Sequence, residues 1–307
     1  MINSDKRIVI TGGNSLIGQH LIEILSKTQY SISAVVRDPT GIKQNEKVSY
    51  LKASLKDYPE LYQRIDRCDT FVSLAWDGGR RNQLDDEERN RFSAEAIEGA
   101  IHSLVEHCGC RKVILAGSHY EYSQQNLPIE ENSDEHPTLA YGKNKLRLYR
   151  RVREYCDKRG VTCIELRLFS VYGSGVASDK MINTIIGRLQ RNENVVLKHG
   201  KQMYSFLHAN DAADAFVRVI EAEPCDSGHF NVASNIHMQL YELVDIMRTT
   251  LGSKSEVRCE DDCLIGGPHT VVLSGKMRRV FSWTPKTSFA SGIKEIAEDN
   301  VLNGEKN

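Results

Sequence analysis

Short runs of apolar and β-branched residues recur along the first part of the chain, and stretches with helical spacing separate several of them. Such runs predict strands, because strands that are buried on both faces of a parallel sheet read as nearly continuous apolar segments. The predicted strands are Arg7–Thr11, Ser31–Arg37, Val48–Lys52, Thr70–Ala75, Lys112–Ser118 and Thr162–Phe169. Strands that alternate with helices predict an α/β fold with a doubly wound parallel sheet.

Apolar residues at intervals of three or four predict the helices. The expected helical segments are 16–25, 92–108, 138–159, 181–189, 212–220 and 238–251. Thr138 and Asp211 are the expected N-caps, since short polar side chains accept hydrogen bonds from the free N–H groups of a first turn. The polar stretch Gly252–Pro268 shows no period and predicts an irregular excursion on the surface.

A glycine-rich turn, Gly12-Gly13-Asn14-Ser15-Leu16-Ile17-Gly18, follows the first predicted strand and leads into the first helix. This order is typical of the dinucleotide-binding unit of a Rossmann fold, in which a pyrophosphate lies on the helix N-terminus. Gly12 would form the tight turn, and Gly18 would allow close packing of helix and strand. Ser15 takes the place of the usual middle glycine, and its hydroxyl can donate to a phosphate.

The periodicity loosens in the second half of the chain, which predicts a division into two parts. Residues 1–175 are expected to form the dinucleotide-binding domain. Residues 176–307 are expected to form mainly a smaller substrate-binding unit over the edge of the sheet. A segment of about 204–232 is expected to return to the main domain.

Composition and charge exclude several classes of protein. The 40 basic and 41 acidic residues give a net charge of −1, which disfavours a nucleic-acid partner. No apolar run is long enough for a membrane span and no leader is evident at the start, so we expect a soluble, cytoplasmic protein. The eight cysteines include the close pairs Cys108/Cys110 and Cys259/Cys263, but neither pair has partners at zinc spacing. We therefore expect reduced thiols and no metal site.

Three residues form a candidate acid–base group. Tyr141 and Lys145 are four residues apart in a predicted helix, so they share one face. A nearby ammonium favours the phenolate and lowers the pKa of a tyrosine, which would make Tyr141 a usable general acid or base. Ser118 ends the fifth predicted strand, at the sheet edge where α/β proteins bind ligands. Its hydroxyl could bind a substrate oxygen while Tyr141 transfers the proton.

The residue at the end of the second predicted strand bears on the choice of cofactor. An acidic residue there selects the free 2′-hydroxyl of the adenosine ribose, whereas an arginine accommodates a 2′-phosphate. Arg37 comes first and Asp38 follows. The pair favours NADP(H) and leaves NAD(H) possible.

The glycine-rich turn, Ser118 and the Tyr141/Lys145 pair together resemble the extended short-chain dehydrogenase/reductase family, in its nucleotide-sugar epimerase/dehydratase branch. The similarity runs along nearly the whole chain. Further matches are Leu74-Ala75, Asn90, LRLFSVYG (166–173), FLHANDAADA (206–215), FNVAS (230–234) and Trp283-Thr-Pro285. Departures from the family pattern include Ser15 for a glycine, Ser54 for an aspartate, Ser170 for an asparagine and Tyr204-Ser205 for an Arg-Asp pair.

The resemblance implies a role for each matching position. Tyr141 would be the catalytic acid or base, Lys145 would lower its pKa and hold the nicotinamide ribose, and Ser118 would bind the reacting oxygen. The implied cofactor contacts are Gly12, Asn14, Ser15, Leu16, Ile17, Gly18, Arg37, Leu74, Ala75, Trp76, Tyr141, Lys145 and Phe169. The implied substrate contacts are Ser118, His119, Tyr120, Tyr141 and Tyr204. A homodimer through the 92–108 and 140–159 helices is implied as well.

The expected reaction follows from two short segments. Dehydratases of the family carry an Asp-Glu pair after the catalytic Ser or Thr, and His119 and Tyr120 stand there instead, which makes a 4,6-dehydratase improbable. The runs LAWDG (74–78) and GSHYEYS (117–123) are similar to those of reductases of 4-keto-6-deoxy sugar nucleotides. We therefore expect a nucleotide-diphosphate-sugar ketoreductase. The alternatives are a 4-epimerase with tightly bound NAD and a non-catalytic NADP(H)-sensing scaffold.

Overall fold

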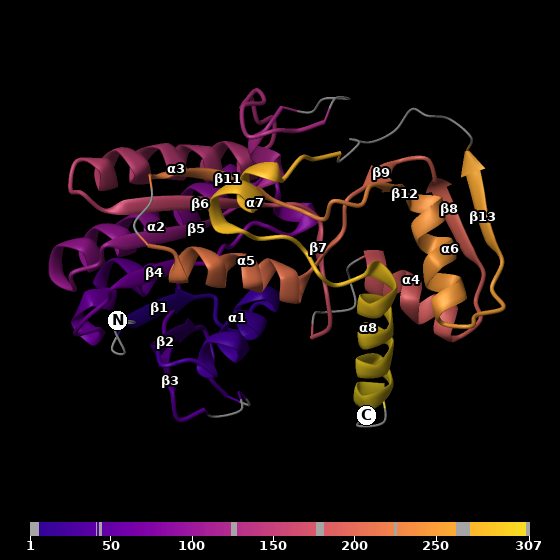
Figure 1. Ribbon diagram of the computed structural model, residues 1–307, viewed down its shortest axis with the longest axis horizontal. Coiled ribbons are helices and arrows are strands. Elements are labelled where there is room, and N and C mark those ends of the chain that lie inside the picture. Colours follow the sequence, from indigo (N-terminus) through magenta and orange to yellow (C-terminus); the bar gives the residue numbers. More distant parts are fainter. Residues whose placement is uncertain are drawn as a thin grey trace.

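The computed structural model describes residues 6–40, 42, 45–123, 128–175, 181–223, 226–261 and 271–304. A parallel seven-stranded sheet, in the order β11-β6-β5-β4-β1-β2-β3, forms the centre of its larger part (Figure 1). The strands are β1 (Arg7–Thr11), β2 (Ser31–Val36), β3 (Val48–Lys52), β4 (Thr70–Ser73), β5 (Lys112–Ser118), β6 (Thr162–Leu168) and β11 (Gly228–Val232). The predicted α/β fold with a doubly wound parallel sheet is confirmed.

The strand order reverses direction between β1 and β4. The chain moves from β1 outward to β3 on one side, and from β4 outward to β6 and β11 on the other. Thr11 pairs with Val35 and Ser73, so the carboxyl ends of these strands meet at one edge. Open α/β sheets bind ligands at such an edge, at the point where the strand order reverses.

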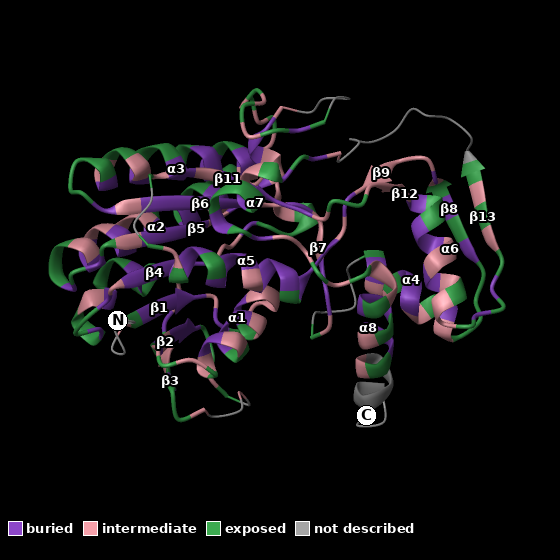
Figure 2. Ribbon diagram, viewed as in Figure 1, coloured by how far each residue is buried: buried purple, intermediate pink, exposed green. Residues whose placement is uncertain are grey.

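Helices cover both faces of the sheet, which explains why its strands are apolar without alternation. Ile8 and Ile10 pack towards α1 and α5, whereas Val9 packs towards α2 and α3. The strands at the centre of the sheet are mostly buried, whereas the helices around it carry exposed residues (Figure 2). The 3-10 segment η1 also lies on the second face. These elements are α1 (Leu16–Ser26), η1 (Leu55–Arg64), α2 (Glu87–His107), α3 (Ala140–Asp157) and α5 (Ala209–Glu221), with the short α7 (Gly275–Phe281) beside β11.

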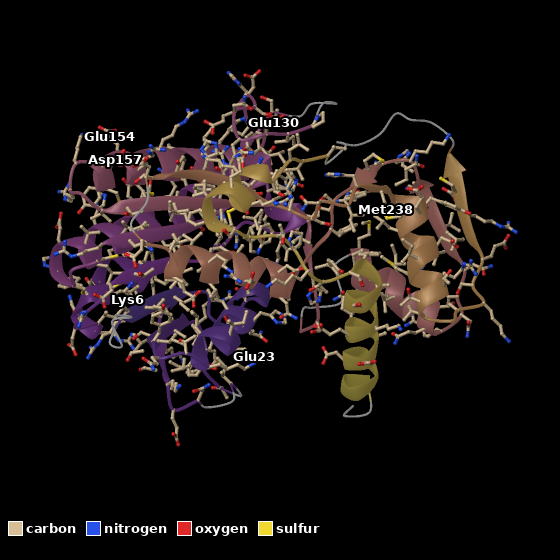
Figure 3. All side chains as sticks on the ribbon, in the orientation of Figure 1. Lys6, Glu23, Glu130, Glu154, Asp157 and Met238 are labelled. Atoms are coloured by element: carbon tan, nitrogen blue, oxygen red, sulfur yellow. The ribbon has the colours of Figure 1, made fainter. Side chains whose placement is uncertain are left out.

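A smaller part lies beyond the carboxyl ends of the strands and has a hydrophobic core of its own (Figure 1). Ile186, Val244 and Ile293 are fully buried there. Its elements are α4 (Met181–Gln190), β8 (Val195–His199), β9 (Met203–Tyr204), β12 (Met238–Gln239), α6 (Leu240–Thr250), β13 (Val257–Asp261) and α8 (Phe289–Gly304). Side chains fill the space between the elements of both parts, and Met238 marks the smaller one (Figure 3).

The chain crosses between the two parts several times. β7 (Val171–Tyr172) pairs with β10 (Leu207–His208) between the sheet and the smaller part. α5 then packs on α1, and β11 joins the sheet beside β6. The hydrophobic pattern did not predict β11, because Gly228, His229 and Asn231 interrupt its apolar residues.

Three strands end earlier in the sequence than predicted. β2 ends at Val36, β4 at Ser73 and β6 at Leu168. The apolar residues that follow, such as Ala75 and Phe169, belong to loops at the carboxyl edge. Apolarity alone therefore extends the predicted strands into the loops of the candidate site.

Neither predicted N-cap is correct. The first helical bond of α3 runs from Lys143 N–H to Leu139 O, which makes Leu139 the N-cap in place of Thr138. The free N–H groups of Ala140 and Tyr141 instead donate to Asp85 Oδ1 and to Leu84 O, at 3.2 and 2.8 Å. A distant loop thus satisfies the first turn, and no local polar residue is needed.

The second predicted cap fails for a related reason. His208 is the N-cap of α5, and Asp211 lies inside the first turn. The Asp211 carboxylate accepts hydrogen bonds from the backbone N–H groups of Lys286 and Thr287, at 3.0 and 2.9 Å. Asp211 therefore joins the C-terminal segment to α5.

The prediction of an irregular stretch over residues 252–268 is wrong in one part. Residues 257–261 form β13, which pairs in parallel with β8. The alternation in this strand is weak because its residues are mostly polar, so the sequence carries little strand signal. Residues 262–268 lie outside the described part of the chain.

Three further findings concern helix hydrophobicity, the cysteines and the surface ion pairs. No helix within the described ranges is long and apolar enough to cross a membrane. Five described cysteines, Cys68, Cys108, Cys110, Cys156 and Cys163, are buried free thiols. At the outer end of α3, Glu154 and Asp157 form exposed ion pairs with Lys158 and Arg153 (Figure 3), and such pairs contribute little to stability.

Candidate active site

The glycine-rich turn forms a close-packed cradle at the carboxyl end of β1. Gly12 has a φ of +75°, and a Cβ there would lie 2.8 Å from the backbone nitrogen of Ala75. A Cβ on Gly18 would overlap the carbonyl oxygen of Gly12. Both positions require glycine, Gly12 for its backbone conformation and Gly18 for the close approach of α1 to the turn.

Ser15 acts as the N-cap of α1, and its Oγ accepts a hydrogen bond from Gly18 N–H at 3.1 Å. The side chain that replaces the usual glycine is therefore accommodated at the helix start. Asn14 is exposed, and Leu16 and Ile17 are partly exposed beside it. The positive end of the α1 dipole points out of this cradle, so the turn suits the pyrophosphate of a dinucleotide.

Arg37 lies apart from the acid–base residues, directly after β2. Its side chain is exposed, as is that of Asp38, which accepts hydrogen bonds from Thr40. This is the edge position expected for the adenosine end of a dinucleotide. Because the Asp38 carboxylate already binds Thr40, the exposed Arg37 guanidinium is the charged group at this position that could meet a ligand.

Ser118 lies at the end of β5, where the short segment η3 (His119–Glu121) begins. Ser118 is 7% exposed, and its Oγ accepts a hydrogen bond from Tyr120 N–H at 3.3 Å. Its own backbone N–H donates to Glu121 Oε1 at 2.7 Å. The turn is therefore fixed on both sides, and it holds the Ser118 hydroxyl next to Tyr141.

Tyr141 lies in the first turn of α3 among aromatic rings. Its ring meets Trp76 edge-on, with 5.8 Å between centroids, and meets Tyr120 edge-on at 5.9 Å. A Cβ on Gly79 would lie 3.6 Å from the Tyr141 ring, so the loop after β4 comes close to it as well. These contacts hold the phenol in one orientation at the carboxyl edge of β5.

The expected lowering of the Tyr141 pKa is wrong for this structure. Burial raises the pKa of Tyr141 far above its usual range, and the nearby Glu121 carboxylate raises it further. The hydrogen bond with Ser118 acts in the opposite direction but is outweighed. The phenol is therefore held protonated, which suits a proton donor.

Lys145 is buried behind Tyr141. Its Nζ donates to the carbonyl oxygen of Ala116 at 2.5 Å and lies 4.2 Å from the centre of the Trp76 ring. The centre of the Tyr141 ring is farther away, at 5.6 Å. Burial lowers the pKa of Lys145 to about 8, although Glu121 and Glu165 favour the charged form. At this distance the Lys145 ammonium, whose own pKa is lowered, does not offset the rise in the pKa of Tyr141 that burial causes.

Asn90 holds the loop that carries Trp76. Its Oδ1 accepts a hydrogen bond from the Trp76 indole N–H at 2.8 Å, and its Nδ2 donates to Gln83 O and Asp86 O. A Cβ on Gly78, which has a φ of +103°, would lie 2.7 Å from Asn90 Oδ1. The buried asparagine thus fixes the loop over Lys145.

The remaining predicted substrate residues form a wall of aromatic rings. The His119 ring lies 4.3 Å from Tyr120 and 5.5 Å from Phe169. Phe169 is fully buried and so supports this wall from behind. Burial lowers the pKa of His119 to about 4, which keeps the imidazole neutral. Tyr204 stacks on Phe206 at 5.2 Å on the side of the smaller part.

The structure thus brings Ser118, Tyr141, Lys145, Trp76 and Tyr120 together. It also shows charged residues beneath them that the sequence analysis missed: Glu121, Glu165 and Arg167, all buried. Their sequence signal was present, since Glu165 and Arg167 interrupt the apolar run of β6. No group of three or more His, Cys, Asp or Glu side chains in the described ranges could hold a metal ion.

Comparisons with known proteins give relatives with several reactions. The chain is 25% identical over 320 residues to the mouse (Mus musculus) dTDP-D-glucose 4,6-dehydratase, covering 95% of this chain and 88% of the relative. It is 23% identical over 308 residues to the CDP-abequose synthase of Salmonella muenchen, covering 96% and 98%. A solved UDP-N-acetylglucosamine 4-epimerase from Methanobrevibacter ruminantium M1 superposes with a TM-score of 0.86 at 20% identity, covering 97% and 99%.

The family model described as the NAD dependent epimerase/dehydratase family matches residues 8–233. The match includes the glycine-rich turn, Ser118, Tyr141 and Lys145, and it confirms the resemblance found in the sequence. Because the matched segment exceeds half of the 307 residues, the chain belongs to the NAD-dependent epimerase/dehydratase family.

Proposed function

We propose that this protein is a reductase that converts the C4 ketone of a 4-keto-6-deoxy sugar nucleotide to an alcohol, with NADPH favoured over NADH. One observation carries this proposal: Tyr141 lies beside Ser118, and His119 and Tyr120 take the place of a carboxylate pair next to them. A protonated phenol suits a reaction that begins with a ketone and ends with proton donation. The runs 74–78 and 117–123, with their similarity to ketoreductases, support the same direction.

Each residue of the site would have its own role in the reaction. A bound nicotinamide cofactor supplies a hydride to the carbonyl carbon. Tyr141 donates its phenolic proton to the oxygen at C4 as negative charge develops there. The Ser118 hydroxyl donates a hydrogen bond to the same oxygen, and this stabilises the developing charge. Lys145 would hold the ribose next to the nicotinamide.

The cofactor would lie along the carboxyl edge of the sheet. The pyrophosphate would lie on the N-terminus of α1, in the Gly12–Gly18 cradle, whose tight packing requires Gly12 and Gly18. Arg37 would face the adenosine ribose, and its exposed guanidinium favours a 2′-phosphate. Residues 1–175 would then serve mainly the cofactor and residues 176–307 mainly the substrate, with Tyr204 in contact with the sugar nucleotide.

We also propose a homodimer through α2 and α3. These helices cover one face of the sheet, and Phe92 on α2 is 48% exposed. A large exposed ring on a helix beside a second exposed helix is a reasonable centre for a self-complementary interface. Sedimentation analysis of the unaltered protein and of Phe92→Asp tests this, and a monomer in both cases would contradict it.

A 4-epimerase is the second candidate. The solved 4-epimerase superposes over 97% of this chain, and the family is described as NAD dependent. An epimerase keeps its NAD through the whole cycle and must remove a proton before it returns one. We favour the reductase because the runs 74–78 and 117–123 are similar to those of ketoreductases.

The test mixes purified protein with NADPH or NADH and freshly prepared 4-keto-6-deoxy derivatives of dTDP, CDP, GDP and UDP sugars. Loss of reduced-nicotinamide absorbance is expected, faster with NADPH, with formation of a C4 alcohol. The absence of any loss, together with NAD released on denaturation, would favour the epimerase. Cofactor binding without turnover of any sugar nucleotide would instead favour a non-catalytic protein.

A further inference from the structure

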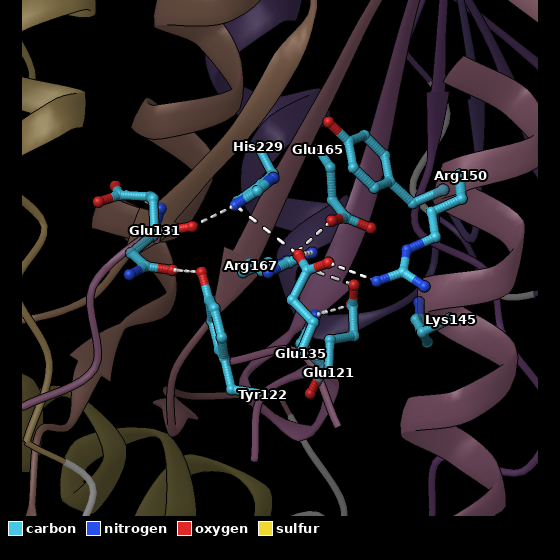
Figure 4. A network of polar contacts seen from close by, with 12 residues as sticks. Glu121, Tyr122, Glu131, Glu135, Lys145, Arg150, Glu165, Arg167 and His229 are labelled. Atoms are coloured by element: carbon cyan, nitrogen blue, oxygen red, sulfur yellow. Dashed lines mark hydrogen bonds and ion pairs between the residues drawn. The ribbon is translucent and has the colours of Figure 1, made fainter. Parts of the chain in front are cut away.

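A cluster of buried charged side chains lies around Arg167, with Lys145 on the neighbouring helix (Figure 4). Glu121 in this cluster accepts a hydrogen bond from the Ser118 backbone N–H. Glu121 and Arg167 are 0% exposed, and Glu165 is 1% exposed. Charged groups are rarely buried to this degree unless they are paired, because removal from water is costly. The proposed proton transfer does not use any of the three.

Arg167 joins three carboxyl groups. Its Nε lies 2.9 Å from Glu165 Oε2 and 3.3 Å from Glu121 Oε2. Its Nη2 lies 2.6 Å from Glu135 Oε1 at the partly exposed end of the cluster. The guanidinium also lies over the Tyr122 ring, 4.5 Å from its centre. Glu121 is the member of this cluster that lies nearest to Ser118 in the sequence.

Gly117 makes room for the carboxyl pair just before Ser118 in β5. A Cβ at this position would lie 2.7 Å from Glu165 Cγ and 2.9 Å from Glu121 Oε1. Any larger residue would push the two carboxyl groups apart or displace the strand. The position of the pair beneath Ser118 therefore depends on a glycine in the strand that carries Ser118.

Glu121 faces charged or titratable groups on every element around it. From β6 it meets Arg167 and Glu165, and from α3 it interacts with Lys145 and Tyr141. From its own turn it accepts the Ser118 N–H at 2.7 Å. Two carboxyl groups beside one arginine in a buried space favour sharing of one proton. Burial raises the pKa of both carboxyl groups, and the pKa of Glu165, which Glu121 raises further, lies well above its usual range. Glu165 is therefore the group that holds the proton, and Glu121, whose Oε1 accepts the Ser118 N–H, carries the charge.

We propose that Glu121 is a positioning residue for the acid–base site. It fixes Ser118 through the backbone N–H, keeps Lys145 charged and keeps Tyr141 protonated. This role rests on the proposed function only where it concerns turnover, because the effects on Ser118 and Lys145 exist without substrate. Glu121 acts through these neighbours and does not touch the reacting oxygen.

The direction of each effect follows from the sign of the charge. The Glu121 carboxylate favours the ammonium and so raises the pKa of Lys145, partly offsetting burial. The same carboxylate disfavours a second negative charge and so raises the pKa of Tyr141. One buried charge therefore favours the proton-bearing form of both groups, which is the state that a proton donor needs before reduction.

The test compares Glu121→Gln with Glu135→Gln. Glutamine keeps an oxygen that can accept the Ser118 N–H but has no charge. Glu135→Gln is the matched control, because it removes a carboxylate from the same arginine while no effect of Glu135 on Lys145 or Tyr141 is evident. Lys145 is titrated by NMR of protein labelled with ¹³C at lysine Cε, with its signal assigned by Lys145→Arg.

Glu121→Gln is expected to lower the titration midpoint of Lys145 by about one pH unit, the size that a charge a few ångströms away produces. Glu135→Gln is expected to leave the midpoint in place. An equal midpoint in the unaltered protein and in Glu121→Gln would overturn the proposal, and so would an equal shift in both variants. This measurement needs no substrate, so it stands even if the reductase assay shows no turnover.

A second variant tests the contact with Ser118. Glu121→Asp keeps the charge but withdraws the carboxylate from the Ser118 N–H, and it remains informative if the glutamine variant does not fold. The expected result is a Lys145 midpoint near that of the unaltered protein, with kcat reduced about tenfold and KM little changed. An unchanged kcat in an active enzyme would show that Glu121 does not position Ser118.

Discussion

At the scale of single residues, the site combines an amine and a phenol whose pKa values have moved in opposite directions. Burial lowers the pKa of Lys145 to about 8 and raises that of Tyr141. The same low-dielectric environment causes both shifts, because it disfavours the charged form of each group. Proximity in the helix is therefore not enough to create a phenolate in this structure.

Tyr141→Phe tests that role directly. The ring contacts with Trp76 and Tyr120 would remain, but the proton donor would be lost. We expect kcat to fall by about 10²–10⁴-fold, the usual contribution of general acid catalysis. Equilibrium binding of NADPH, followed by calorimetry, should change little. Tyr62→Phe is the control, because Tyr62 lies on η1, where its ring contacts His107 of α2, away from Ser118. Comparable activity of Tyr141→Phe and Tyr62→Phe would refute the assignment.

Arg37→Ser tests the preference for the cofactor. The exposed guanidinium after β2 would no longer pair with a 2′-phosphate. We expect the affinity for NADPH to fall about tenfold, roughly 1.4 kcal/mol, while that for NADH stays nearly constant. Calorimetric titration with both cofactors measures this. Lys158→Ser, which removes an exposed basic side chain at the outer end of α3, is the control. A parallel loss for both cofactors would indicate that Arg37 does not discriminate.

At the scale of elements, the sequence predicted what depends on neighbours in the chain. The spacing of Gly12 and Gly18 reflects one tight turn and one close contact, and both are local requirements. The N-terminus of α3 was not predictable in this way, since Leu84 and Asp85 satisfy its N–H groups from another loop. Glu121 was missed as well, because a carboxylate in the short turn after β5 gives no sign that it will be buried beside Arg167.

Gly142→Ala tests how tightly α3 is seated on the active-site turn. A Cβ at this buried helix position would overlap the carbonyl oxygen of Tyr120 and lie 2.9 Å from Pro137. We expect unfolding to become easier by about 1–3 kcal/mol and activity to fall, since Tyr120 packs on Tyr141. Urea denaturation and the reductase assay measure the two effects.

Gly187→Ala is the matched substitution in another helix. Gly187 lies in α4, where a Cβ would lie 3.4 Å from the flexible end of Arg191. Alanine there should be neutral or stabilising by about 0.5–1 kcal/mol, because glycine disfavours a helix interior. If both variants were equally stable, the close approach of α3 to Tyr120 would not constrain the fold.

At the scale of the whole molecule, the site lies between two parts that are joined by several specific contacts. Asp211 on α5 binds the backbone of residues 286–287, and Ser174 donates to Glu295 on α8 at 2.9 Å. The Tyr172 ring packs against Phe206 and Phe289. Tyr204 packs against the core of the smaller part, whereas Ser118 ends β5 in the sheet, so the two residues come from different parts.

The stability of the whole chain should depend on pH through its buried histidines. The Nε2 of His229 lies 2.7 Å from Glu131 O, and since a carbonyl only accepts, this nitrogen carries a hydrogen. Burial lowers the pKa of His229 to about 4, and the Arg167 charge adds to the effect. In the unfolded chain the pKa is about 6.5. Between these values the unfolded chain binds a proton that the folded protein does not.

Stability should therefore fall as the pH drops below about 6.5, and the loss should continue to about pH 4. For His229 alone we expect a decrease of roughly 1–2 kcal/mol in the free energy of unfolding between about pH 7 and pH 5. His119, with a similarly lowered pKa, contributes in the same direction, whereas Glu165, with its raised pKa, opposes both. Urea unfolding at the two pH values measures the sum, and His229→Gln should make the dependence shallower. An equally steep dependence in His229→Gln would mean that the ring gains its proton without loss of the fold, and that the Arg167 cluster tolerates a further positive charge.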